Sequence, residues 1–119
     1  MRGFGELEGP VMEQLWSLGG SATVREVLER LRTSREIAYT TVLSTMDNLY
    51  RKGHLTREKL GKAHRYRAVL SQAEHSAALM RDALEAGTDS EAVLTHFVGE
   101  MSAEELRRLR AVIARRDDV

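Results

Sequence analysis

Four polar side chains recur on one face of a predicted helix near residues 38–52. If Val42 marks the buried side, a repeat of about 3.6 residues per turn places Thr40 and Ser44 on the outer side. Thr41 and Asn48 then lie beside them. Hydroxyl and amide groups can form hydrogen bonds with base edges in the major groove of DNA. The sequence therefore predicts base contacts from these four residues, with an ordinary solvated polar face as the alternative.

Basic side chains accompany this helix and the segment that follows it. Residues 35–67 contain eight basic residues (Arg35, Arg51, Lys52, Arg57, Lys59, Lys62, Arg65 and Arg67) and three acidic ones (Glu36, Asp47 and Glu58). Cations concentrated in this way can bind the phosphates of DNA. Such contacts supply affinity and orientation but carry no sequence information. The predicted contacts to the DNA backbone are Arg51, Lys52, Lys62, Arg65 and Arg67. Tyr39 either stacks on the backbone as well or covers the core.

The elements that position these residues follow from apolar spacing and from turn residues. In chain order they are a helix over about residues 6–18, a helix that starts at Thr23, a helix over about 38–52, and strands over about 55–59 and 64–69. Thr23 and Glu26 have the spacing of a capping box. Gly53 can end the third helix, and Gly61 lies in a basic turn between the strands. Residues 21–24 can also form a short strand that leads into the second helix, and residues 1–4 are expected to be loose. This order predicts a winged-helix DNA-binding domain over residues 1–70.

The rest of the chain, residues 71–119, is predicted to be a three-helix dimerisation region. Its helices are expected over about residues 72–86, 90–100 and 103–116. A segment of this length is close to the limit for an independent core, so we expect it to pack against a second copy. Folding back onto the DNA-binding domain is the alternative. The predicted interface residues are Met80, Leu84, Leu94, Phe97, Val98, Leu106, Leu109 and Ile113. The expected fold class is mainly α with a small β-hairpin wing.

Composition excludes several classes of function. The 119 residues are 42% hydrophobic and 30% charged, with no cysteine, which excludes disulfides and thiolate metal sites. Net charge is zero, but residues 1–70 carry 12 basic and 8 acidic side chains, against 6 and 10 in residues 71–119.

No long apolar run or signal-like start is present, so we expect a cytoplasmic protein. The four histidines lack metal-ligand spacing, so most are expected to be surface or capping residues. No nucleophile motif or phosphate-binding glycine loop occurs. We predict no enzyme activity, no metal and no cofactor.

With these segments in place, the chain resembles the BlaI/MecI/CopY family of bacterial repressors from Leu7 to about Ala114. The motifs that carry the resemblance are Leu7 to Trp16, Ala38 to Val42, Leu49 to Gly53, His64-Arg65-Tyr66, and His96-Phe97-Val98 before Ser102 to Leu106. The first two blocks, in this order, are the most specific. The resemblance implies a homodimer with an N-terminal winged helix and a helical C-terminal dimerisation region. Such dimers bind palindromic operators and block transcription.

The family also suggests how such a repressor is released. In the penicillinase repressors, a membrane sensor protease system leads to a cut at an Asn-Phe pair within the C-terminal helices. The aligned positions here are His96 and Phe97, which are the candidate cleavage site and depart from the family pattern. The copper-responsive branch carries a cysteine-rich site that this chain lacks.

The leading interpretation is therefore a homodimeric repressor that reads palindromic operator DNA. Its partners would be double-stranded operator DNA, a second copy and a membrane sensor protease. The alternatives are a winged-helix module for protein interaction and a regulator that responds to a small molecule.

Overall fold

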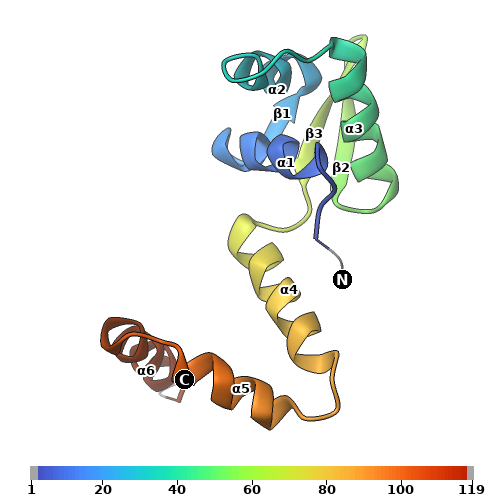
Figure 1. Cartoon of the computed structure of the whole chain (residues 1–119). Coiled ribbons are helices and arrows are strands. Elements are labelled where there is room, and N and C mark those ends of the chain that lie inside the picture. The colour runs from blue at the N-terminus through green and yellow to red at the C-terminus, as the bar shows by residue number, and fades with distance from the viewer. Residues whose placement is uncertain (1–2, 118–119) are drawn as a thin grey trace. The chain divides into compact units, whose positions relative to one another are not determined.

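The computed structural model describes residues 3–117, which divide into two compact units (Figure 1). The first unit, which ends at Leu79, holds α1 (Glu8–Ser17), β1 (Ser21–Thr23), α2 (Val24–Leu31), α3 (Tyr39–Arg51), β2 (Leu55–Leu60) and β3 (Ala63–Ala68). Helix α4 (Gln72–Glu85) begins in the first unit and ends in the second, which also holds α5 (Ser90–Gly99) and α6 (Ala103–Asp117). This order confirms the predicted fold class, mainly α with a small wing.

Local capping groups set the limits of the helices in the first unit. The Thr23 hydroxyl accepts from the Glu26 N–H at 3.2 Å, and the Glu26 carboxylate accepts from the Thr23 N–H at 2.8 Å. This is the capping box predicted from the sequence. After α3, Gly53 has a φ of 88°, a left-handed conformation that a side chain would strain. The predicted start and end of the central helices therefore follow from a few residues.

The sheet has three antiparallel strands in the order β1-β3-β2. Pairing of β2 with β3 runs from Leu55 opposite Ala68 to Leu60 opposite Ala63, and Gly61 lies in the turn with a φ of 61°. We call β2, β3 and this turn the wing. The wing agrees with the predicted strands to within one residue. Strand β1 confirms the short strand predicted within residues 21–24.

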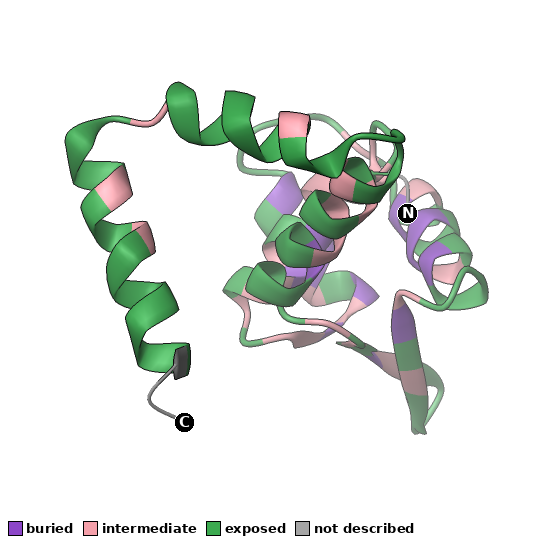
Figure 2. Ribbon diagram, turned by 90° about the horizontal axis from the view of Figure 1, so that it is seen from below, coloured by how far each residue is buried: buried purple, intermediate pink, exposed green. Residues whose placement is uncertain are grey.

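The core of the first unit lies between its helices and the sheet (Figure 2). Its buried apolar side chains come from all three helices and all three strands: Val11, Met12, Leu15, Ala22, Val24, Val27, Leu28, Leu31, Val42, Met46, Leu49, Leu55 and Tyr66. Tyr66 is only 1% exposed, so its ring anchors the wing to the core. Trp16 packs at the edge, where its indole N–H donates to the Leu70 carbonyl at 3.0 Å. The core fixes α3 and the wing in one rigid arrangement.

An aromatic cluster joins the N-terminal segment to the start of α4. The His75 ring is 6% exposed and stacks on Phe4, with ring centroids 4.2 Å apart and an interplanar angle of 10°. His54 meets the same Phe4 ring edge-on at 4.9 Å. The expectation that residues 1–4 are loose is wrong for Phe4, because its ring packs against the core and both imidazoles. Residues 1 and 2 lie outside the part of the chain that the structure describes. Buried His75 differs from the surface position expected for most histidines.

The second unit is a set of helices without a core of its own. No residue from 76 to 116 is buried, and Figure 2 shows α5 and α6 mostly in the colour of exposed residues. A capping box starts α6: the Ser102 hydroxyl accepts from the Glu105 N–H, and the Glu105 carboxylate accepts from the Ser102 N–H. Among residues 3–117, no helix combines the length and the apolar composition needed to cross a membrane.

Candidate nucleic-acid interface

Helix α3 separates its apolar and polar sides as the sequence predicts. Val42, Met46 and Leu49 are fully buried, whereas Thr40, Ser44 and Asn48 are exposed and Thr41 is half-buried. Thr45 is also buried, and its hydroxyl donates to the Thr41 carbonyl at 2.8 Å, so its polar group is satisfied within the helix. The four predicted base-contact residues therefore lie along the side of α3 that the core leaves open.

The first turn of α3 is open and is flanked by cations. Ala38 precedes the helix and provides no side-chain cap, so the backbone N–H groups of the first turn favour a negative ligand. Tyr39 is 39% exposed, and the Arg25 guanidinium lies 5.6 Å from its ring centroid. Tyr39 thus lies partly at the surface, where a DNA backbone can reach it. Arg25 was missed at the sequence level, because its place beside Tyr39 depends on how α2 packs against α3.

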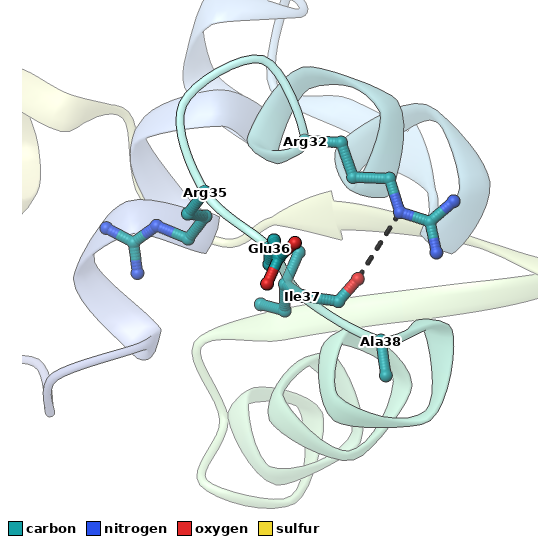
Figure 3. Close-up of a pocket in the computed structure, with 5 residues that line it drawn as sticks. All are labelled: Arg32, Arg35, Glu36, Ile37 and Ala38. Carbon is teal, nitrogen blue, oxygen red and sulfur yellow. Dashed lines mark hydrogen bonds between the residues drawn. The ribbon is translucent and has the colours of Figure 1, made fainter.

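The loop between α2 and α3 brings two more arginines close to this end. It lines an open pocket of about 630 Å³ formed by Arg32, Arg35, Glu36, Ile37 and Ala38 (Figure 3). The Arg32 Nε donates to the Ile37 carbonyl at 3.3 Å, while the Arg35 side chain extends on the other side of the loop (Figure 3). Both arginines are exposed, so this loop can add positive charge beside the helix start.

At the other end of α3, one carboxylate binds two arginines. Asp47 Oδ2 accepts from Arg51 at 2.8 Å, and Asp47 Oδ1 accepts from Arg57 of β2 at 2.6 Å. The Arg57 guanidinium also lies 4.1 Å from the centroid of the Tyr50 ring. The hydrogen bond from Arg51 and the charges of both arginines lower the pKa of Asp47, which is therefore ionised at neutral pH. The predicted backbone residue Arg51 is part of a network between α3 and the wing.

The remaining predicted backbone residues fall into two groups. Lys52 donates to Glu8 at 2.7 Å, and Arg65 donates to Ser21 at 3.2 Å and to Glu26 at 3.1 Å. These bonds join α3 to α1 and the wing to α2. Lys52 is exposed in its pair, and exposed pairs are weak, so Lys52 can exchange Glu8 for phosphate at little cost. Arg65 is partly buried and is held by two partners. Lys62 and Arg67 are exposed and belong to none of the ion pairs within residues 3–117.

The residues predicted for dimerisation remain uncovered in the single chain. Phe97 is 49% exposed, and the other members of the set are exposed or half-buried: Met80, Leu84, Leu94, Val98, Leu106, Leu109 and Ile113. His96 is also exposed, and the bond between residues 96 and 97 lies within α5. No group of three or more potential metal ligands occurs among residues 3–117.

Comparison with known proteins places these features among transcriptional regulators. The family model described as penicillinase repressor matches residues 4–115. The transcriptional regulator BlaI of Mycobacterium tuberculosis, in strains CDC 1551 / Oshkosh and ATCC 25618 / H37Rv, is 41% identical over 113 residues. That match covers 92% of this chain and 82% of each relative, and neither relative is described as an enzyme. A solved structure of hsRosR-S4 is 17% identical with a TM-score of 0.55, covers 98% of this chain and 92% of its own, and is similar in fold.

Proposed function

The chain belongs to the penicillinase repressor family, and on that premise we propose that it is a homodimeric transcriptional repressor of palindromic operator DNA. In the proposed complex, α3 lies in the major groove and Thr40, Thr41, Ser44 and Asn48 contact base edges. The wing lies along the sugar-phosphate backbone. Residues 1–70 serve DNA binding, and residues 71–119 serve association between the two copies.

The outer side of α3 is the observation that carries this proposal. A helix of 13 residues buries its apolar side in the core and keeps its hydroxyl and amide groups exposed. A major groove about 12 Å wide accepts a helix in this orientation. The cations around α3 fit the phosphates on either side: Lys62 and Arg67 on the wing, and Arg25 and Arg32 near the helix start, where Tyr39 offers a ring and a hydroxyl.

Dimerisation is supported by the apolar side chains that the second unit leaves exposed. Leu94, Phe97 and Ile113 are each about half-exposed. Burial of apolar area is favourable at roughly 25 cal/mol per Å², so a second copy of the same helices is a suitable cover. A twofold axis between two identical chains also presents α3 twice, as a palindromic operator requires.

Release by proteolysis is a further part of the proposal. A sensor protease would cut α5 between His96 and Phe97, in the middle of the apolar side chains assigned to the dimer. Both residues are exposed in the single chain. The cut would therefore weaken dimerisation without touching α3 or the wing.

Selection of bound duplexes from random DNA, followed by the mass of the complex, tests the proposal. We expect one inverted repeat to be enriched, with two chains bound to each duplex. Affinity should fall steeply with salt, because log K falls by about 0.9 per phosphate neutralised for each unit of log salt concentration. A chain that enriches no sequence, or that binds DNA without salt dependence, is not a repressor of this kind. A module for protein interaction would then be the better interpretation.

A further inference from the structure

Asp47 is an acidic residue on the side of α3 that we assign to DNA. A carboxylate near phosphate is unfavourable, so its position there needs a physical reason. Both of its oxygens are used, one by Arg51 and the other by Arg57. The two arginines come from different elements, since Arg51 ends α3 and Arg57 lies on β2, which is beside α3 (Figure 1).

The two ion pairs leave each guanidinium partly free. Arg51 bonds Asp47 through Nη2 and Arg57 bonds it through Nη1, and a guanidinium has five N–H donors in a planar fork. Arg57 is held more firmly, because its guanidinium also packs over the Tyr50 ring at 4.1 Å. Asp47, the Tyr50 ring and the nearby Tyr66 hydroxyl therefore hold Arg57 firmly, whereas Asp47 orients the more exposed Arg51 through one ion pair.

We propose that Asp47 is a specificity-determining residue, because it restricts Arg51 and Arg57 to phosphate contacts that form only when α3 is seated at its operator. The inference rests on the proposed function. Binding to random DNA is almost entirely electrostatic, so any cation free to move strengthens it. In the operator complex, base contacts fix the position of α3, and pre-oriented arginines meet the phosphates without rearrangement. A negative charge that restrains nearby cations therefore lowers the affinity for random DNA more than the affinity for the operator. Contacts that disfavour the wrong partner raise specificity in the same way in other complexes.

The test compares Asp47→Asn with the unaltered chain on two duplexes, the selected operator and a random sequence, over a range of salt concentrations. Asparagine keeps the size of the side chain but loses the charge that holds the arginines. We expect affinity for the random duplex to rise by about tenfold at low salt. The slope of log K against log salt should steepen by up to about 1.8, from two further phosphates at about 0.9 each. Operator affinity should stay constant or fall, so the ratio of the two affinities decreases.

Glu58→Gln is the matched control. It removes one negative charge from the exposed part of β2, next to Arg57 in sequence, and Glu58 is in none of the ion pairs within residues 3–117. Its effect measures how far a lost charge alone strengthens binding to both duplexes. The affinity ratio should stay near that of the unaltered chain. The double variant Asp47→Asn/Arg57→Gln should remove about half of the added salt dependence, because one of the two released cations is gone.

Three results would overturn the inference. The first is an Asp47→Asn variant with the same affinity ratio and salt slope as Glu58→Gln. The second is a change of preferred base at a single operator position without stronger random binding, which would make Asp47 a base-contacting residue. The third is a double variant that retains the full added slope.

Circular dichroism checks folding, and Asp47→Ser replaces Asp47→Asn in the same assay if the latter is unfolded. If the unaltered chain selects no sequence, the proposed function fails as well; if it selects one and the ratio is insensitive to Asp47, only this inference fails.

Discussion

The two units of the chain differ in how far they bury their apolar side chains. In the first unit, three helices and three strands bury 13 apolar side chains in one core. In the second, helices that also carry many apolar residues leave Leu94, Phe97 and Ile113 about half-exposed. The spacing of apolar residues along a helix therefore predicts that one face will be covered. It does not predict whether the same chain or a second chain covers that face. The first unit covers its own faces, and the second is suited to a second chain.

The largest expected effect is on the core of the first unit. Leu49 is fully buried on α3, so Leu49→Ala should lower the free energy of unfolding by about 2–5 kcal/mol. Urea titration followed by fluorescence of Trp16, which packs against that core, measures the change. Leu94→Ala is the matched control, because Leu94 is 48% exposed and its loss should barely affect the first unit. Equal losses in the two variants would remove the contrast between the units.

The next effect concerns association. Phe97→Ala should weaken the dimer by about 2 kcal/mol, roughly a thirtyfold rise in the dissociation constant, because aromatic side chains at an interface contribute strongly. Sedimentation equilibrium of the free protein measures it. Glu91→Ala on the same helix should change the constant little, because Glu91 is charged and exposed. A chain that is monomeric before any substitution would refute the assignment of the second unit.

A smaller effect should appear in the pH dependence of unfolding. Burial lowers the pKa of His75 below its ordinary value near 6.5, and the nearby His54 adds to this effect. The unfolded chain takes up this proton as pH falls through 6.5, whereas the folded chain takes it up only at lower pH. Stability is therefore fully present above pH 6.5 and is lost as pH falls toward the folded pKa, by about 1.4 kcal/mol per pKa unit of difference.

His75→Phe isolates this contribution, because phenylalanine can keep the stack on Phe4 and cannot take up a proton. Between pH 7.5 and 5.5, thermal unfolding of this variant should depend less on pH than that of the unaltered chain. The carboxylates of Glu8 and Glu26 do not interfere, since their lowered pKa values place their loss of stability below pH 4.5. An unchanged pH profile in His75→Phe would show that His75 does not couple protonation to folding.

Local structure was predictable from the sequence where a few neighbouring residues decide it. The capping boxes at Thr23, Ser71 and Ser102 and the left-handed Gly53 and Gly61 place the ends of helices and the turn of the wing. The exposed side of α3 followed from the periodicity of its apolar residues. These features depend on backbone groups within a few residues of one another.

The contacts around the candidate interface were not predictable in this way. Lys52 pairs with Glu8, which is 44 positions away, and Arg65 reaches Glu26 across 39. The stack of Phe4 on His75 joins the N-terminal segment to α4. Such pairs depend on how elements pack, and charge alone does not distinguish Lys62, which is exposed, from Arg57, which is bound to Asp47. The sequence therefore located the cations but not their partners.

Cleavage of DNA by a metal chelate attached to α3 measures most directly whether the outer side of this helix lies against the bases. The chain has no cysteine, so Ser44→Cys provides a single attachment point, and Ser90→Cys on α5 provides the control. On the selected operator, the chelate at position 44 should cut both strands within each half-site, symmetrically about the centre, and the chelate at position 90 should not. Equal cutting from the two positions, or none from position 44 while the operator is bound, would contradict the placement of α3 in the major groove.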